Sequence, residues 1–259
     1  MDLRSFAFIF DLDGCVYTGN ALVPGVARCL AAIRARGQQV LFLTNNSREF
    51  GDELLDKLVR LGIHATASEM LSAAEVAGPF VREHFGPSRV LVMGSDRLKQ
   101  GVSEAGHTVI SAEESTPADV VVVGHDFAFD YKKLAAMARA VADGAAFVAV
   151  NRDPRLPIEG GEFLPGCGAM VAAVSAATGA SPIIIGKPEP HIFQAALARL
   201  RHPADATVMV GDTLESDVRG GQRAGLHTIW LAPAGAAAAN PQPDLTIHHF
   251  DELTAALQR

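Results

Sequence analysis

Runs of apolar residues alternate with amphipathic stretches along this chain, in the order that a parallel α/β protein requires. The first run, Phe6–Phe10, is rich in aromatic and β-branched residues and predicts a buried strand. The stretch Val26–Gly37 predicts a helix that ends at a glycine, and Val40–Leu43 predicts the next strand. Leucines recur on one face of the stretch Leu54–Leu61, which predicts a second helix. Strand, helix, strand, helix is the pattern of a doubly wound sheet.

The middle of the chain repeats this pattern. Strands are predicted at Arg89–Gly94, at the valine run Val120–Gly124 and at Phe147–Val150. A helix is predicted between the last two of these strands, at Tyr131–Ala142, and a segment rich in proline and glycine covers residues 154–168. These elements predict two further α/β units, without the acidic strand ends of the first domain.

The last third returns to a parallel-sheet pattern, with apolar runs that predict the strands Pro182–Gly186, Thr207–Gly211 and Thr228–Leu231. We therefore expect a discontinuous core, residues 1–76 plus 179–259, with an inserted α/β domain at 77–178. The predicted fold class is α/β, with a Rossmann-like doubly wound parallel sheet in the core.

Composition and charge argue against some binding partners and indicate the compartment of the protein. The chain has 259 residues and a formal net charge of −7, and this acidity argues against nucleic acid as a partner. Its three cysteines have no metal or disulfide spacing, which suits a reducing compartment. The N-terminus lacks a signal-peptide pattern, and no apolar run approaches the length needed to span a bilayer. We expect a cytoplasmic protein without a membrane partner.

Polar side chains of complementary chemistry follow four of the predicted strands. They are Asp11 with Asp13, Thr44 with Asn45, Lys187, and Asp212 with Asp217. Each has a simpler explanation taken alone, since such residues also cap helices or make turns, and a loop lysine is usually solvated. Parallel strands, however, bring all four ends to one edge of a sheet, where ligands of open α/β folds bind.

This set of residues suits phosphoryl transfer, in which catalysis consists mostly of positioning and charge neutralisation. As a nucleophile, Asp11 would repel a phosphate dianion unless a cation bridged the two. Asp11, Asp212 and Asp217 make a hard oxygen site of the kind that suits Mg²⁺. Lys187 supplies a second positive charge and Thr44 a hydroxyl donor. Asp13 is the candidate acid that protonates the leaving oxygen and then deprotonates the hydrolytic water.

Together these residues resemble the four motifs of the haloacid dehalogenase superfamily. The matching segments are Asp11-Leu-Asp13-Gly14, Thr44-Asn45, Lys187-Pro188 and Gly211-Asp212-x4-Asp217. The long insertion between the second and third motifs resembles the large α/β cap of the subgroup that contains the NagD-like, p-nitrophenyl-phosphate, phosphoglycolate and pyridoxal-phosphate phosphatases. The resemblance covers nearly the whole chain.

The resemblance implies a role for each position. Asp11 would be nucleophile and metal ligand, and Asp13 would be acid/base and give the metal its backbone carbonyl. Asp212 would be the second carboxylate ligand of Mg²⁺, and Asp217 would hold a metal-bound water. Thr44, Asn45 and Lys187 would bind the phosphate. An aspartate at position 13 favours phosphomonoesters, because an alkoxide leaving group needs its proton.

The inserted domain is expected to select the substrate, a small phosphorylated metabolite. Candidate residues are His125 and Asp126 after the valine strand, and Asn151, Arg152 and Asp153 after the next one. An equally good reading is that Asn151 and Asp153 only form a turn before Pro154. Caps of this kind often form dimer contacts in the family, so a homodimer through the cap is a further expectation.

Three alternative functions would use similar residues. A phosphotransferase or phosphomutase would return the phosphoryl group to a sugar, although the mutases of this superfamily have a small helical cap at another insertion point. A phospho-acceptor signalling module also combines acids, a threonine and a lysine, but is about half as long. A catalytically inactive binding protein would not need the complete set of acids. Phosphomonoester hydrolysis is therefore the predicted function.

Overall fold

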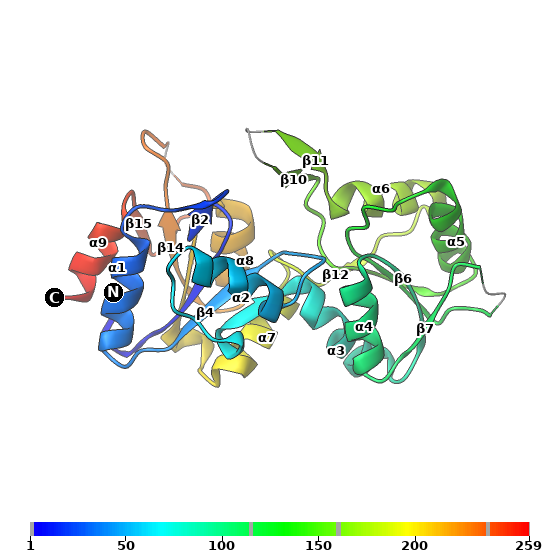
Figure 1. Ribbon diagram of the computed structural model, residues 1–259, viewed down its shortest axis with the longest axis horizontal. Helices are drawn as coiled ribbons and strands as arrows, with labels where there is room; N and C mark the ends of the chain where they lie inside the picture. Colours follow the sequence, from blue (N-terminus) through cyan, green and yellow to red (C-terminus); the bar gives the residue numbers. More distant parts are fainter. Residues whose placement is uncertain (1–2, 114–115, 159–161, 237–238, 259) are drawn as a thin grey trace. The chain divides into compact units, whose positions relative to one another are not determined.

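The computed structural model describes residues 3–113, 116–158, 162–236 and 239–258. It divides into two compact units. The core unit consists of Met1–Thr44, Gly51–Leu71 and Lys187–Arg259, and the inserted unit of Asn45–Phe50 and Ser72–Gly186. Each unit contains its own parallel sheet with helices packed against it (Figure 1).

The sheet of the core unit has six strands in the described part of the chain, in the order β15-β14-β13-β1-β4-β5. β1 is a central strand of this sheet, and it pairs in parallel with β13 on one side and β4 on the other. The strands are β1 (Ala7–Asp11), β4 (Val40–Thr44), β5 (Met70–Ser72), β13 (Thr207–Gly211), β14 (His227–Leu231) and β15 (Leu245–Ile247).

Helices cover this sheet, as its apolar strands require. Phe8 and Phe10 of β1 pack in one buried cluster with Phe42 of β4 and Phe250 of α9. The helices of the core unit are α1 (Val26–Ala35), α2 (Gly51–Arg60), α7 (Pro190–Leu200), α8 (Gly220–Arg223) and α9 (Phe250–Leu257). The short elements are the 3-10 helices η1 (Leu3–Ser5), η2 (Ala67–Glu69) and η4 (Ala204–Ala206), the π-helix η5 (Leu214–Arg219), and the hairpin of β2 (Tyr17–Thr18) and β3 (Ala21–Leu22).

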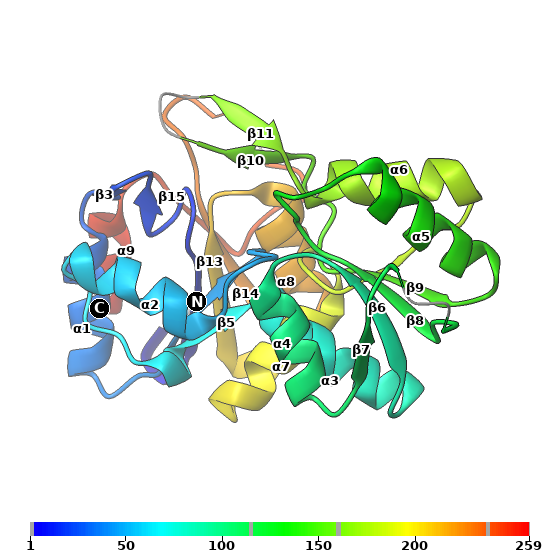
Figure 2. The same cartoon turned by 45° about the vertical axis from the view of Figure 1, so that its right-hand side comes forward.

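The inserted unit has a five-stranded sheet in the order β12-β9-β8-β6-β7, in which every neighbouring pair of strands is parallel. Figure 2 shows α5 and α6 on one face of this sheet and α3 and α4 on the other. The strands are β6 (Arg89–Met93), β7 (Thr108–Ile110), β8 (Val120–Val123), β9 (Ala146–Ala149) and β12 (Ile183–Ile184), with a hairpin of β10 (Arg155–Pro157) and β11 (Phe163–Pro165). The helices are α3 (Ala73–Phe85), α4 (Asp96–Glu104), α5 (Tyr131–Ala142) and α6 (Cys167–Thr178).

The boundaries of the units differ from the expected ones at residues 45–50, 72–76 and 179–186, all of which lie in the inserted unit. The strand expected before Lys187 in the core is β12, which pairs with β9 instead. The backbone N–H groups of Ile185 and Gly186 continue this ladder by donating to Ala149 and Val150. A short apolar run shows that a strand forms but not which sheet it joins, and this is why the expectation for 179–186 was wrong.

The predicted fold class, a doubly wound parallel core with an α/β insertion, is confirmed. None of the helices in the described residues combines the length and the apolar content that crossing a bilayer requires.

Candidate active site

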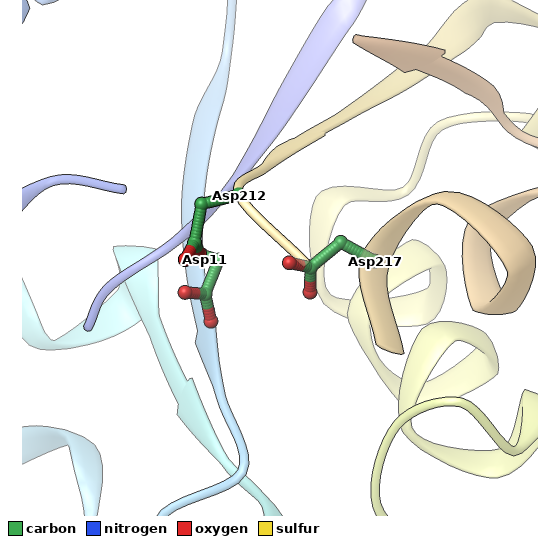
Figure 3. Close-up of side chains that lie close together, drawn as sticks. All are labelled: Asp11, Asp212 and Asp217. Atoms are coloured by element: carbon green, nitrogen blue, oxygen red, sulfur yellow. The ribbon is translucent and has the colours of Figure 1, made fainter. Parts of the chain in front are cut away.

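Three carboxylates gather at one edge of the core sheet. Asp11 is the last residue of β1, Asp212 directly follows β13, and Asp217 lies in η5. One oxygen of each lies within 4.8 Å of an oxygen of the other two, and Figure 3 shows the three side chains at this place. Among the described residues, this is the group of acids placed closely enough to share a metal ion.

Strand order explains why these residues meet. β13, β1 and β4 are neighbours and run in the same direction, so their carboxyl ends lie side by side. Asp11 pairs with Leu43 in the ladder, which places Thr44 one residue further along β4. Thr44 is buried, as the end of a central strand is. The expectation that these strand ends share one edge is therefore confirmed for the three strands of the core.

Two glycines of the motifs leave room for the carboxylates. Gly14 has a φ of +92°, a conformation that L-residues with a side chain rarely adopt, and a Cβ at this position would overlap the Asp212 carboxylate. A Cβ at Gly211 would overlap the carboxylate of Asp217. Both acids thus approach the backbone more closely than any residue other than glycine would allow.

Lys187 is the cation of this cluster. Its side chain is 3% exposed, and its Nζ lies 2.5 Å from Asp11 Oδ1 and 2.7 Å from Asp217 Oδ1. The second oxygen of Asp217 accepts a hydrogen bond of 3.0 Å from the backbone N–H of Thr213. Although its preceding strand belongs to the inserted unit, Lys187 itself lies in the core unit with the acids. Asp217 therefore anchors both the lysine and the start of η5.

Burial and charge shift the ionisation of this cluster. Burial raises the pKa of Asp11 well above its ordinary value, as do the charges of Asp217 and Asp212, while Lys187 opposes the shift. Burial and the charge of Asp217 raise the pKa of Asp212 to about 6. Burial alone would lower the pKa of Lys187, but the two carboxylates beside it raise it overall. One lysine for three acids leaves negative charge in excess.

Asp212 has an oxygen without a partner. Its Oδ1 is buried and makes no hydrogen bond, which costs free energy unless a cation or donor satisfies it. The indole Nε1–H of Trp230 donates to the backbone oxygen of Asp212 at 2.8 Å and so fixes the backbone at this residue. A buried, unpartnered carboxylate oxygen among two further carboxylates fits a hard divalent cation such as Mg²⁺.

Asp13 lies beside the cluster and is exposed. Its backbone forms a bridge with Tyr17, and its Oδ2 accepts a hydrogen bond of 3.5 Å from the Tyr17 hydroxyl. Its charge contributes to the raised pKa of Asp212, and Gly14, the next residue along the chain, lies against the Asp212 carboxylate. An exposed carboxyl at this place suits proton exchange with a substrate better than metal binding.

The remaining predicted residues belong to the inserted unit, where Asn45, Asn151 and Asp153 form one hydrogen-bonded cluster. Asn151 Nδ2 donates to Asn45 O at 2.6 Å, and Asn45 Nδ2 donates to Asp153 Oδ2 at 3.0 Å. The backbone N–H of Asp153 donates to Asn151 Oδ1, which is the bond of an Asx turn. These bonds support the turn reading of Asn151 and Asp153, and they place Asn45 with this cluster. Arg152 is exposed.

His125 and Asp126 form the start of a loop between β8 and α5, and both are buried. His125 Nε2 donates to Pro165 O at 3.1 Å, its buried Nδ1 has no partner, and burial lowers its pKa. Asp126 accepts from Lys133 Nζ at 2.7 Å and from the backbone N–H of Ala128 at 2.8 Å. Its carboxylate therefore shapes the loop that carries it.

Replacing Asp126 by asparagine should destabilise the inserted unit by about 2 kcal/mol, because a buried charge-assisted bond to Lys133 is lost. Chemical denaturation followed by far-ultraviolet circular dichroism measures this loss. The matched control is Asp143→Asn, which removes an exposed carboxyl after α5 and should leave stability unchanged. A stable Asp126→Asn variant with an altered ranking of substrates would instead assign Asp126 to substrate selection.

Two residues that contact the candidate site were not predicted from the sequence. Tyr17 contacts Asp13, and Trp230 holds the backbone of Asp212. Tyr17 lies four residues after Asp13, within reach of a tight turn, and this spacing was an available signal. Trp230 lies 18 residues from Asp212 on the neighbouring strand β14, and no local pattern announces that contact.

Comparison with known proteins reveals two family matches. The haloacid dehalogenase-like hydrolases match residues 8–108, and a HAD-hydrolase-like family matches residues 184–253. The chain is 34% identical over 258 residues to an acid sugar phosphatase from Staphylococcus aureus, with 98% of each chain covered. It is 31% identical over 249 residues to the 5'-nucleotidase YutF from Bacillus subtilis, with 95% of each covered.

A solved structure has the same fold over the whole chain. It is a 4-nitrophenylphosphatase from Thermotoga maritima, with a TM-score of 0.89, 28% sequence identity and complete coverage of both chains. The matched length includes the inserted unit as well as the core. The predicted resemblance therefore extends to the complete architecture.

Proposed function

Since the chain belongs to the haloacid dehalogenase superfamily, in its NagD-like group of phosphatases, we propose that it hydrolyses small phosphomonoesters with the help of Mg²⁺ and through an aspartyl-phosphate intermediate. One observation carries this proposal. Asp11, a buried aspartate at the end of the central strand β1, is clustered with Asp212, Asp217 and the ammonium of Lys187. This arrangement provides a nucleophile, anionic metal ligands and a fixed positive charge.

Asp11 and Asp212 are the residues that would hold Mg²⁺. Asp212 Oδ1 is buried without a partner, whereas both oxygens of Asp217 already accept hydrogen bonds. Asp217 therefore acts by holding Lys187 and η5, and the backbone carbonyl of Asp13 is the further ligand that the family resemblance implies. When bound, the ion would neutralise the charge of the phosphate and allow an anionic nucleophile to approach it.

The reaction has two steps in this chain. In the first, a carboxylate oxygen of Asp11 attacks the phosphorus, the bond to the leaving oxygen breaks, and Asp13 gives that oxygen its proton. In the second, Asp13 takes a proton from water, which attacks the phosphorus and releases inorganic phosphate from Asp11. Lys187 and Thr44 bind the nonbridging oxygens, and Asn45 is proposed as a further phosphate ligand.

Small phosphorylated metabolites are the proposed substrates. The names of the two curated relatives indicate sugar phosphates and nucleoside monophosphates as the first classes to test. Phosphoglycolate, glycerol phosphate and pyridoxal phosphate complete the panel. Because the core residues described above recognise the phosphate and not the rest of the substrate, we propose that the inserted unit selects among them. Its first candidate residue is the exposed Arg152, because the buried His125 and Asp126 are engaged within their own loop region.

Removing divalent cations with EDTA should lower phosphate release from this panel by at least about a hundredfold, and Mg²⁺ should restore it. Saturating Mg²⁺ should also stabilise the protein, by about 2.7 kcal/mol at a concentration of 100 times Kd, because it binds only the folded cluster. Inorganic phosphate assays and thermal unfolding with and without Mg²⁺ measure the two effects.

A control distinguishes Mg²⁺ binding at the cluster of Asp11, Asp212 and Asp217 from Mg²⁺ binding at other carboxylates. Asp212→Asn should lose the Mg²⁺-induced rise in Tm, whereas Asp205→Asn, at an exposed position in η4, should keep it. Full activity in EDTA would contradict the proposed metal dependence. Transfer of the phosphoryl group to glycerol or a sugar in place of water would favour the phosphotransferase alternative.

A further inference from the structure

The segment between Asp13 and Tyr17 is a tight turn that brings these two residues together. The backbone N–H groups of Val16 and Tyr17 both donate to Leu12 O, at 2.9 and 3.1 Å. The N–H of Gly14 donates to Tyr17 O at 2.8 Å. These bonds fix the backbone of Asp13 relative to that of Tyr17.

Tyr17 is held rigidly on its other sides. Its side chain is 2% exposed and belongs to the buried cluster that includes Phe8 and Phe10. The ammonium of Lys57, from α2, lies 3.7 Å from the centre of the Tyr17 ring. A cation over the face of a phenol ring is attracted to it and draws electron density away from the hydroxyl group, which makes that group a stronger donor.

Asp13, in contrast, is exposed, and its Oδ2 accepts the hydrogen bond from this rigid hydroxyl at 3.5 Å. The bond is long. It nevertheless links the exposed side chain of Asp13 to the side chain of Tyr17, which its packing holds in place. A protonated carboxyl whose Oδ2 accepts this bond would carry its transferable proton on Oδ1. The orientation of the proton toward a leaving group thus depends on Tyr17.

We propose that Tyr17 is a positioning residue for Asp13, which it orients for proton transfer to the leaving oxygen, and that Lys57 strengthens this effect through the ring. The inference rests on the proposed function. In the step concerned, an oxygen of Asp11 forms a bond to phosphorus while the bond from phosphorus to the leaving oxygen breaks. The proton on Asp13 Oδ1 moves to that oxygen at the same time, so that the alcohol leaves neutral.

A dependence on the leaving group follows from this role. An alkyl phosphate releases an alkoxide unless Asp13 protonates it, so the orientation of Asp13 should affect its reaction strongly. p-Nitrophenyl phosphate releases a stabilised phenolate that needs no proton, so its reaction should depend little on Asp13. A residue that only stabilises the fold would affect both substrates alike.

The test compares Tyr17→Phe with Tyr131→Phe, since the chain has two tyrosines and Tyr131 is exposed on α5. The readout is kcat/KM for glycerol phosphate, or the best alkyl substrate, and for p-nitrophenyl phosphate. This ratio reports the steps up to departure of the leaving group and not the later hydrolysis. Tyr17→Phe should lower the value for the alkyl phosphate about tenfold and that for p-nitrophenyl phosphate less than about threefold, while Tyr131→Phe changes neither.

Two further variants complete the test, and the first of them, Lys57→Met, can still contradict the proposal if Tyr17→Phe folds poorly. Lys57→Met should reduce the alkyl phosphate reaction about threefold with the same selectivity. In an Asp13→Asn background, Tyr17→Phe should cause no additional loss of kcat/KM for the alkyl phosphate, because Tyr17 acts through Asp13. An equal loss for both substrates, no loss for either, or an undiminished effect in the Asp13→Asn background would overturn the inference.

Failure of the proposed function has a different signature. In that case the wild-type protein would release no phosphate from either substrate, and the inference would fall with it. A wild-type enzyme that hydrolyses both substrates, with variants that lack the predicted selectivity, would overturn the role of Tyr17 alone.

Discussion

Asp11→Asn is expected to abolish phosphate release, with a loss of at least about a thousandfold in kcat for every phosphomonoester tested. An amide oxygen is a poor nucleophile, and an uncharged side chain at this position also removes one anionic ligand of the proposed Mg²⁺ site. Asp217 is not available to take over the attack, because its two oxygens accept hydrogen bonds from Lys187 and from the backbone N–H of Thr213. Phosphate assays at matched protein and Mg²⁺ concentrations measure the loss.

The same variant should remain folded, which separates loss of chemistry from loss of structure. Burial raises the pKa of Asp11, so the ionised carboxylate costs stability at neutral pH. A neutral amide avoids this cost, and Lys187 keeps the carboxylate of Asp217 as its partner. We therefore expect a Tm equal to or above that of the wild type. Activity within about tenfold of the wild-type value would contradict the assignment of Asp11 as nucleophile.

The control is Asp56→Asn, at an exposed position on α2, which should leave both activity and Tm unchanged. The sign of the pH dependence gives an independent check. A carboxyl with a raised pKa favours folding more at low pH than at high pH, and this contribution is lost as pH rises through its folded pKa. The Tm advantage of Asp11→Asn should therefore be largest at neutral and higher pH and should shrink on acidification.

Much of the core site could be predicted because parallel strands place their carboxyl ends at one edge. Asp11, Thr44 and Asp212 lie at the carboxyl ends of three neighbouring strands, and an apolar strand that ends in a polar residue is visible in a single sequence. The role of Asp217 was harder to predict. Its distance from Lys187 is set by η5, a π-helix whose geometry no local pattern indicates.

Lys187 was expected to lie near the acids of the core, and it does, but the strand before it is not part of the core sheet. The apolar run before it was expected in the core sheet, but β12 extends the sheet of the inserted unit. Lys187 nevertheless reaches Asp11 and Asp217, because the chain enters the core unit at that residue. Which of two parallel sheets accepts a two-residue strand depends on tertiary packing, and hydrophobic periodicity carries no information about it.

Residues of the inserted unit were the least predictable. Asn45, Asn151 and Asp153 have side chains that serve equally as turn formers and as ligand contacts. The hydrogen bonds among them account for a turn and for the joining of residue 45 to this unit. Asp126 similarly supports its own loop. Residue type identifies a polar position, but only its partners indicate whether it is available to a substrate.

Replacing Lys187 by methionine is expected to destabilise the core unit by about 3 to 5 kcal/mol, the largest effect on stability predicted for a single substitution here. The ammonium lies between two buried carboxylates, at 2.5 Å from Asp11 and 2.7 Å from Asp217. Methionine fills a similar volume but leaves both charges buried without a cation. Phosphate release should be lost as well, because the same ammonium is the proposed ligand of the phosphate.

Unfolding in urea, followed by tryptophan fluorescence, measures this loss in the core unit specifically. Trp230 is the single tryptophan of the chain and lies on β14. The matched control is Lys132→Met, which removes an exposed ammonium from α5 and should leave the transition unchanged. Adding Asp217→Asn to Lys187→Met should recover part of the lost free energy, because one of the two unpaired carboxylates is then neutral.

The loss should also depend on pH in a defined direction. Asp11 and Asp217 raise the pKa of Lys187, so in the wild type this lysine stabilises the fold below its unfolded pKa, throughout the neutral and acid range, until its partners are protonated. Without the lysine, the carboxylates repel one another most when both are ionised. The difference between wild type and Lys187→Met should therefore shrink as pH falls and the acids take up protons. If Lys187→Met is as stable as the wild type at neutral pH, the ammonium of Lys187 does not stabilise the buried carboxylates of Asp11 and Asp217. That result would also contradict the proposed phosphate site, which depends on the same ammonium.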